Sequence, residues 1–321
     1  MKIDPFVILL FLSIFVAYIY PPLGSGTGTF SLSTAAHYGV SLIFFFYGLR
    51  LNWEKIAQGL SNYRLHVVVH LSTFVLFPLL VLPLALHFSP PGEPDWLWIG
   101  IFFLATLPST VSSSVVMVNM ARGNVPAAIF DASISSLLGV FITPLWMQFF
   151  ISSQTSGKDL SSVVFSLIVQ VILPVLLGIA LHRQMGAFSQ RHDKTLRKFD
   201  QSVILLIVYT SFCHSFQDKM FSAISLQTLA LLSAGMVGLF FVVYFIVALW
   251  CRILRFNRED TITALFCGSK KSLVHGVVMS QVLLPNAKLA GILILPTMIY
   301  HALQLIIVSV IASRFAKDGT E

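Results

Sequence analysis

Residues 104–114 read LATLPSTVSSS, and residues 267–272 read CGSKKS. Each run places a proline or glycine and small hydroxyl side chains inside a stretch that is otherwise apolar enough to cross a membrane. Unwound backbone in a bilayer must be buried in protein or line a wet cavity, because lipid cannot satisfy its polar groups. A kinked helix whose serines bond to their own backbone is the simpler alternative. The presence of two such runs at matching places in the chain favours two broken helices.

The composition around these runs is that of a membrane protein. Of the 321 residues, 56% are hydrophobic and only 10% are charged, and the mean hydropathy is +0.86. Soluble domains carry about a quarter charged residues, so a cytoplasmic enzyme is excluded and the lipid bilayer is the main solvent. The net charge of +7 comes without any nucleic-acid-binding motif, and nucleic acid is not an expected partner. Protease, lipase and ATP-binding motifs are also absent, which indicates no enzyme.

Apolar stretches long enough to span a bilayer recur along the whole chain. A transmembrane helix needs about 20 apolar residues. We predict ten spans, near 5–20, 34–49, 65–88, 96–121, 126–151, 162–181, 202–217, 226–251, 260–283 and 290–312. Fifteen of the 20 lysines and arginines then fall on the side of the N-terminus and three on the other. Basic residues favour the cytoplasm, so both termini are expected there, in a plasma (inner) membrane.

The two halves of the chain resemble each other. An offset of 162 aligns residues 115–117, VVM, with residues 277–279, also VVM, just after the interrupted fourth span of each half. Five spans per half is an odd number, so the second copy is inverted. We therefore predict an all-α integral membrane fold with five-helix repeats at 1–160 and 161–321. Inverted repeats are typical of transporters, whose substrate site lies between the copies near the membrane midplane.

Buried charge marks the predicted site. Lys270 lies ten residues beyond Asp260, which is about 15 Å into the membrane, and Lys271 follows it. A central lysine costs about 2.5–3.5 kcal/mol, so the pair requires a partner or a polar cavity. Asp131 is the one acid well inside a span, and Ser135 shares its helix face. We predict that Asp131 lies near Lys270 or Lys271, either as part of the transport site or as a fixed ion pair.

The candidate substrate- and ion-binding residues surround the two interruptions. Unwound carbonyls can ligate a cation, and a restarting helix offers free N–H groups to an anion. The candidates are Ser112, Ser113, Ser114, Asp131, Ser135, Ser269, Lys270, Lys271 and Ser272. His66 and His70, one turn apart, favour packing or interhelical hydrogen bonding.

Several of these motifs point to one family. The runs SSSVVM at 112–117, ARGNV at 121–125, FYGLRL at 46–51 and CGSKKS at 267–272 resemble the bile acid:sodium symporter family. They are most similar to the branch typified by sodium/bile acid cotransporter 7 and its bacterial relatives. The resemblance implies a panel domain of spans one, two, six and seven and a core domain of spans three to five and eight to ten. It also implies that broken helices four and nine cross in the core, which moves against the panel to give alternating access.

The same resemblance bears on the coupling ion. Ser113 and Ser114 match sodium ligands of the symporters, and with Asp131 they form a candidate residual sodium site. Other ligand positions depart from the family, since they hold Ala128, Ala132, Phe266 and Lys270. These changes remove ligands and place a positive charge where a cation would bind. A lysine ammonium beside Asp131 would then replace sodium, and coupling would be independent of sodium or linked to protons.

Three functions follow from these observations. The favoured one is secondary active transport of a small organic anion, with sodium or the proton as coupling ion and no other cofactor. A cation/proton antiporter of the same fold is the second, although such antiporters normally need two adjacent acids. A membrane regulator of ion homeostasis that transports nothing is the third. No oligomeric state is predicted.

Overall fold

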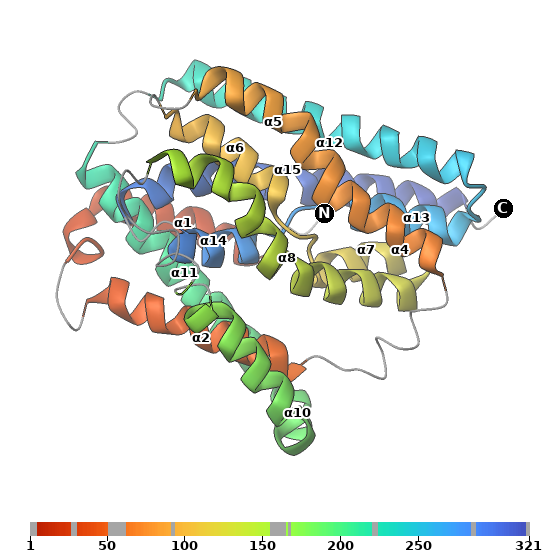
Figure 1. Cartoon of the computed structure of the whole chain (residues 1–321), viewed down its shortest axis with the longest axis horizontal. Coiled ribbons are helices and arrows are strands. Elements are labelled where there is room, and N and C mark those ends of the chain that lie inside the picture. Colours follow the sequence, from red (N-terminus) through yellow and green to blue (C-terminus); the bar gives the residue numbers. More distant parts are fainter. Residues whose placement is uncertain are drawn as a thin grey trace. The chain divides into compact units, whose positions relative to one another are not determined.

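The chain is all-helical. The computed structural model describes residues 5–26, 31–50, 62–90, 94–154, 165, 168–219, 224–283 and 287–318. Within these ranges the regular structure is helical and no strand occurs, which confirms the all-α prediction. Figure 1 shows the helices in chain order.

Each predicted span contains at least one helix in its described part. The first half contains α1 (Pro5–Ile19), η1 (Pro21–Leu23), α2 (Leu32–Arg50), α4 (Tyr63–Leu71), η2 (Ser72–Leu76), α5 (Phe77–Phe88), α6 (Trp96–Thr106), α7 (Ser112–Met120) and α8 (Val125–Gln154). The second half contains η3 (Ile168–Ile172), α10 (Leu173–Arg191), α11 (Asp193–Gln217), α12 (Leu226–Ile253), α13 (Arg258–Gly268), α14 (Leu273–Leu283) and α15 (Ala287–Asp318).

Six helical stretches in the described part of the chain are long and apolar enough to cross a membrane. They are Leu32–Arg50, Tyr63–Phe88, Val125–Phe150, Ile168–Arg191, Leu226–Ile253 and Leu289–Lys317. Shorter apolar helices cover Ile8–Ile19 and Trp96–Thr106. The total of ten crossings and the inverted repeat stay predictions, and the repeat boundary at 160 lies outside the described residues.

The chain divides into two compact units that do not follow the two sequence halves. Unit 1 comprises Met1–Leu51, Thr155–Ile224 and Val277–Ile294. Unit 2 comprises Asn52–Gln154, Ser225–Gly276 and Leu295–Glu321. Each unit therefore draws on both halves of the sequence.

Unit 1 is held together by close helix packing. Helices α2 and α10 cross where a Cβ on Gly48 would overlap the carbonyl oxygen of Val175. A Cβ on Gly178 would likewise overlap the carbonyl oxygen of Phe45. Small residues let helix backbones approach closely, which is the usual way to gain packing energy in a membrane.

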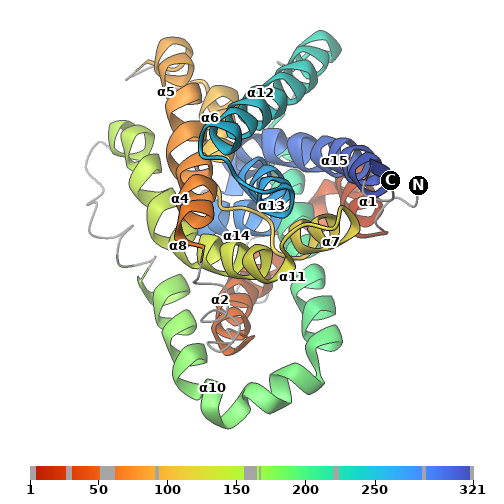
Figure 2. The same ribbon diagram turned by 90° about the vertical axis from the view of Figure 1, so that its right-hand side faces the viewer.

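Unit 2 contains both interruptions predicted from the sequence. Helix α6 ends at Thr106 because Leu107 precedes Pro108 and takes an extended conformation, with φ −68° and ψ 151°. The chain restarts as α7 at Ser112. Helix α13 ends at Gly268, and α14 begins at Leu273. In this unit α13 packs against α4, α7 and α8, an arrangement that can be followed in Figures 1 and 2.

A π-helical turn, η2, separates α4 from α5 within one continuous helical stretch. The N–H of Phe77 bonds to the carbonyl of Ser72, five residues back. Pro78 follows Phe77 and has no N–H to donate. The carbonyls of Thr73 and Phe74 are therefore left without main-chain donors, and the indole of Trp146 donates to Phe74 O at 2.9 Å. Turns of this kind are often found at functional sites.

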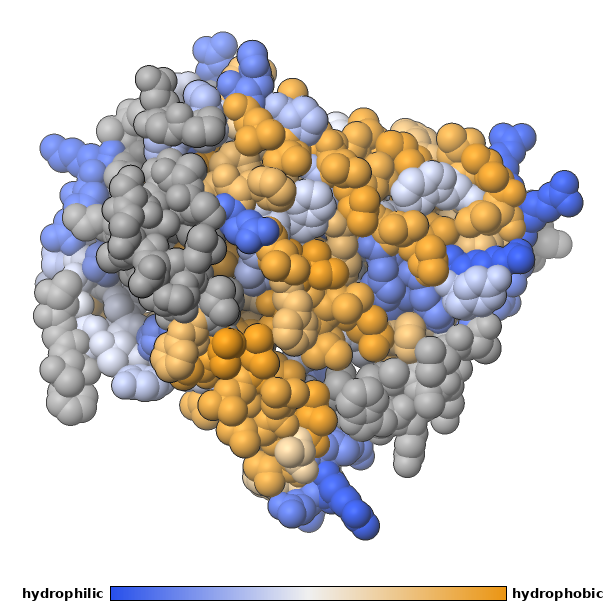
Figure 3. All heavy atoms as spheres, viewed as in Figure 1, coloured by the Kyte–Doolittle hydropathy of each residue, from blue (hydrophilic) through white to orange (hydrophobic). Residues whose placement is uncertain are grey.

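Large apolar side chains remain exposed on the helices, including Phe15, Phe165 and Phe245. Much of the described surface in view in Figure 3 is hydrophobic. Soluble monomers rarely expose apolar surface on this scale. The pattern fits helices whose outer faces contact lipid.

Candidate functional site

The ammonium of Lys271 lies in a cage of main-chain carbonyls. Its Nζ donates to Thr73 O at 2.6 Å, to Ala105 O at 2.7 Å and to Leu107 O at 2.8 Å. The side chain is fully buried, and Nζ also lies 4.2 Å from the ring centroid of Phe77. Three donated bonds use the full capacity of an ammonium group. The burial cost of this charge is thus offset without a carboxylate.

Two side chains of α15 hold the interrupted backbone around Lys271. Gln304 accepts from Lys271 N at 2.9 Å through Oε1 and donates to Lys271 O at 2.8 Å through Nε2. The hydroxyl of Tyr300 donates to Ser269 O at 2.7 Å. These bonds replace those that a continuous helix would have made.

Polar groups of the two interruptions also form hydrogen bonds with each other. Ser109 Oγ donates to Cys267 O at 2.6 Å, and Ser114 Oγ donates to Phe266 O at 3.4 Å. In return, Ser272 N donates to Pro108 O at 2.8 Å. The carbonyls at the end of α13 are thus capped by side chains of the α6–α7 segment.

Lys270 has a simpler environment than its neighbour. It is fully buried, and in the described part of the chain its Nζ has one hydrogen-bond partner, Ser113 Oγ at 2.7 Å. The Ser113 hydroxyl donates in turn to Thr110 Oγ1 at 2.9 Å. Since an ammonium has three donors, Lys270 retains capacity that Lys271 does not.

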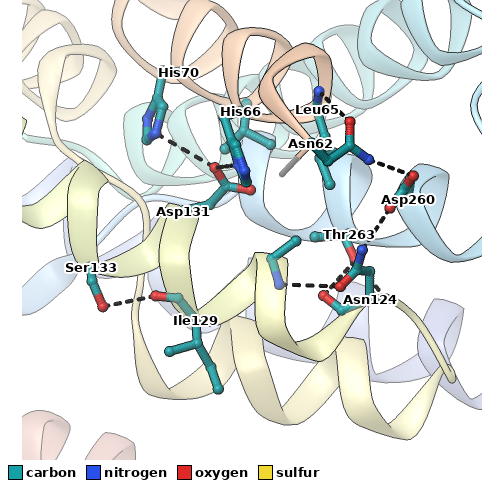
Figure 4. A network of polar contacts seen from close by, with 12 residues as sticks. Asn62, Leu65, His66, His70, Asn124, Ile129, Asp131, Ser133, Asp260 and Thr263 are labelled. Atoms are coloured by element: carbon teal, nitrogen blue, oxygen red, sulfur yellow. Dashed lines mark hydrogen bonds and ion pairs between the residues drawn. The ribbon is translucent and has the colours of Figure 1, made fainter. Parts of the chain in front are cut away.

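Asp131 lies on α8 between two histidines of α4 (Figure 4). His66 Nδ1 donates to Asp131 Oδ1 at 2.7 Å, and His70 Nε2 lies 3.5 Å from the same oxygen. The carboxylate is fully buried, yet among the described residues its Oδ2 has no hydrogen-bond partner. The ring nitrogens of His70 also lack hydrogen bonds within this part of the chain.

The ion pair expected between Asp131 and Lys270 or Lys271 is absent from the described part of the chain. Among the described residues, the charged partners of Asp131 are His66 and His70. Lys271 is engaged by carbonyls and Lys270 by a serine. The reason is that unwound backbone and hydroxyls already supply the oxygens that the two ammonium groups need.

A second buried acid, Asp260, joins three helix beginnings in the same unit (Figure 4). Its carboxylate accepts from Asn62 Nδ2 at 2.6 Å and from Asn124 Nδ2 at 2.8 Å. Each asparagine also caps a helix, since Asn62 accepts from Leu65 N and Asn124 from Ala127 N. Both oxygens of Asp260 are therefore used, in contrast to those of Asp131.

The remaining predicted site residues have local roles. Ser135 Oγ accepts from Ser109 N at 2.9 Å, which places it at the first interruption. Ser269 Oγ donates to Leu265 O, and Ser272 Oγ bonds to His275 Nδ1 at 3.0 Å. The side chain of Ser112 lies outside the described residues.

His66, His70 and Thr73 were not among the site residues predicted from the sequence. The two histidines carried a signal, because they are one turn apart and thus share a face. Thr73 carried no such signal, because it contacts Lys271 through its main-chain carbonyl, which is available only because of the π-turn. In the described part of the chain, no group of three His, Cys, Asp or Glu side chains is arranged to hold a metal ion.

Comparisons with known proteins agree with these features. Residues 4–317 match the SBF-like CPA transporter family. The putative symporter YfeH of Escherichia coli K12 is 36% identical over 317 residues, which are 98% of this chain and 94% of the relative. PA2026 of Pseudomonas aeruginosa is 37% identical over 314 residues, 98% of this chain and 93% of the relative. Sodium/bile acid cotransporter 7 of Danio rerio is 29% identical over 311 residues, 95% of this chain and 91% of the relative.

The match extends over nearly the whole chain, and it confirms the family resemblance drawn from the sequence motifs. With six helices long and apolar enough to span a bilayer, this is an integral multi-pass membrane protein. The chain belongs to the SBF-like CPA transporter family.

Proposed function

We propose that this protein is a secondary active transporter that moves a small organic anion by alternating access. The observation that carries the proposal is a pair of fully buried lysines on interrupted backbone, inside a family of transporters. Ionisable residues within membrane segments generally mark substrate or ion pathways. The substrate class is further supported by the name of the Danio rerio relative, a sodium/bile acid cotransporter.

The moving parts in this proposal are a core and a panel. The core comprises spans three to five and eight to ten, and the panel comprises spans one, two, six and seven. Ten spans in two inverted repeats would place both termini in the cytoplasm of a plasma (inner) membrane. The division into two compact units supports this scheme in part, because unit 1 contains the panel spans and unit 2 most of the core, although residues 277–294 of spans nine and ten belong to unit 1.

Lys270 is the residue that would attract the anion. Its ammonium is buried and donates to a single described partner, Ser113. A carboxylate or sulfonate on the substrate would supply the acceptors that the remaining two donors need. Lys271 is less suited, since its three donors are occupied.

The proton is the coupling ion that the side chains support best. Ala128, Ala132 and Phe266 are buried and offer no side-chain oxygen to a sodium ion. Asp131 has a buried oxygen with no hydrogen-bond partner in the described part of the chain, beside two histidines, an arrangement that can take up and release a proton. Sodium binding at Ser113, Ser114 and Asp131 is the competing assignment.

A cation/proton antiporter is the second candidate function. The buried, incompletely bonded Asp131 favours it, because a cation could replace the proton there. The antiporter would carry no organic anion and would respond to cation and pH gradients alone.

Uptake into proteoliposomes tests these assignments together. The purified chain is reconstituted and offered radiolabelled taurocholate and a set of smaller carboxylates, under a sodium gradient, under a proton gradient or under neither. We expect anion uptake that follows the proton gradient and is unchanged when sodium is replaced by choline. Uptake that requires sodium would assign the coupling to the sodium site instead.

Two further outcomes would overturn the proposal. Cation-dependent dissipation of a pH gradient without anion uptake would identify an antiporter. No gradient-dependent movement of any anion or cation would favour a regulator. Lys270→Ala, with Lys270→Arg as its charge-preserving control, then tests whether Lys270 meets the anion, because only the alanine variant should lose uptake.

A further inference from the structure

The oxygens around Lys271 come from places where the main chain has lost its own donors. Thr73 O has no helical partner, because Phe77 N bonds to Ser72 and Pro78 has no N–H. Ala105 O would be the helical partner of Ser109 N, but that N–H donates to Ser135 Oγ instead. Leu107 O follows the end of α6. Three orphaned carbonyls thus converge on one point.

A ring of carbonyls with an aromatic face beside it is the environment of a monovalent cation. Carbonyl oxygens replace the hydration shell of potassium in selective channels, and aromatic faces attract ammonium groups. Here the oxygens lie 2.6 to 2.8 Å from Nζ, and the Phe77 ring lies 4.2 Å away. All of these groups belong to unit 2, and each of them is buried.

We propose that the carbonyls of Thr73, Ala105 and Leu107 form a monovalent-cation site whose permanent occupant is the ammonium of Lys271. The site binds a small primary alkylammonium ion when that side chain is removed. The covalently attached cation joins the π-turn, the end of α6 and the α13–α14 interruption throughout the transport cycle. It stays in place while Lys270, one residue earlier, serves the substrate.

This assignment separates two lysines that the sequence presents as a pair. Lys271 has three carbonyl partners, and Gln304 also holds its main chain. Lys270 has one hydroxyl partner in the described part of the chain. The first environment suits a fixed charge, and the second suits a group that changes partners.

Chemical rescue of Lys271→Ala tests the site. The missing atoms beyond Cβ correspond to n-propylammonium, so this ion should refill the cage. The variant is purified in detergent and melted with increasing n-propylammonium chloride, n-propanol or sodium chloride. We expect the Tm to fall by about 10 °C, because three buried carbonyls lose their donor at about 1–3 kcal/mol each, and to be restored in a saturable manner by n-propylammonium alone.

Lys270→Ala is the matched control, since it removes the neighbouring lysine. Its Tm should not respond to n-propylammonium, nor should that of the unmodified protein. Lys271→Met fills the apolar part of the space without a charge, so we expect it to melt early and to resist rescue.

Three results would overturn the proposal: an unchanged Tm for Lys271→Ala, equal rescue by n-propanol, or equal rescue of Lys270→Ala. If Lys271→Ala folds only when n-propylammonium is present during purification, removing the ion should cause the variant to aggregate. Failure to obtain folded Lys271→Ala with the ion, while Lys271→Met folds, also overturns the assignment. Because melting is the readout, such a failure leaves the transport proposal standing.

Discussion

Two regions of unit 2 bury charge in opposite ways. At the meeting of the two interruptions, Lys271 has three acceptors and the nearby carbonyls have donors. At the aspartate cluster, Asp131 is equally buried, but one of its oxygens and both ring nitrogens of His70 have no hydrogen bond among the described residues. Among the described residues, every polar group of the first region named here has a hydrogen-bond partner, and several groups of the second have none.

We interpret the difference as one between a charge that stays fixed and a carboxylate that exchanges a proton. A fully bonded buried network rigidifies the structure around it, because any departure orphans several polar groups at once. A buried group without a partner is costly, and its presence calls for an explanation such as a catalytic or ion-binding role. The comparison supports the proposed roles, in which the carbonyls around Lys271 stabilise the fold and Asp131 exchanges the proton.

The largest effect is expected from Asp131→Asn, which tests whether Asp131 and the surroundings of Lys271 have different roles. The substitution keeps the shape of the side chain and removes its titrating carboxyl group. Proton transfer by a positioned group contributes about 10²–10⁴-fold, so we expect proton-driven uptake to fall at least about 100-fold. The measurement is initial uptake rate in proteoliposomes, with the Tm taken on the same preparation.

Asp260→Asn is the matched control for that experiment, since it neutralises the other buried acid. Asp260 accepts from two asparagine caps, so its loss should lower the Tm while leaving the proton dependence of uptake in place. Equal proton dependence of uptake in the Asp131→Asn variant and the unmodified protein would remove Asp131 from the coupling mechanism.

A second experiment, Ser109→Ala, tests the region where the two interruptions meet around Lys271. The substitution leaves Cys267 O without the hydroxyl that donates to it at 2.6 Å. An orphaned buried acceptor costs about 1–3 kcal/mol, and we expect a loss of about 2 kcal/mol in the free energy of unfolding, measured by denaturant titration. Ser136→Ala is the control, because among the described residues Ser136 Oγ bonds only to Ala132 O of its own helix. An equal loss in both variants would argue against a special role for the interruptions.

His70→Gln tests whether His70 takes part in proton exchange with Asp131. Glutamine keeps hydrogen-bonding capacity but cannot carry a proton. We expect proton-driven uptake to fall about fivefold, equivalent to about 1 kcal/mol of lost interaction. His87→Gln, on the exposed part of the same helical stretch, should have no effect, and a fall as large as that for His70 would show that the loss is not specific to the cluster.

The smallest effect is expected from Trp146→Phe. This change removes the indole that donates to Phe74 O at 2.9 Å, one of the two carbonyls freed by the π-turn. The loss should be about 1 kcal/mol in unfolding free energy, and uptake should be unchanged. A marked drop in uptake at full stability would mean that the π-turn, and not the aspartate cluster alone, takes part in transport.

Much of the architecture was predictable because it depends on local chemistry. Pro108 marks the end of α6, since proline restricts the residue before it, and the glycine and serines of residues 268–272 mark the end of α13. Apolar length predicted the helices of every span in its described part, apart from the two interruptions. The motif at residues 121–124 led to the family, and Asn124 within it caps a helix.

The partners of the buried charges were beyond the sequence. Asp131 and His66 are 65 residues apart, and which face of each helix meets the other is decided by packing. The carbonyls around Lys271 have no side-chain signature at all. The prediction of an Asp131–lysine pair failed because it counted side chains as the only counter-groups and omitted freed main-chain oxygens.

The sequence by itself determined that this chain is a helical membrane protein with two interrupted helices, because hydropathy, proline and glycine act within a few residues. It also determined that charge lies inside the membrane segments, since Asp131, Lys270 and Lys271 occur within apolar stretches of the sequence. Only the tertiary structure decided that Lys271 is held by carbonyls and Asp131 by histidines. Those contacts join residues from distant parts of the chain, and their geometry depends on how the helices are rotated against one another.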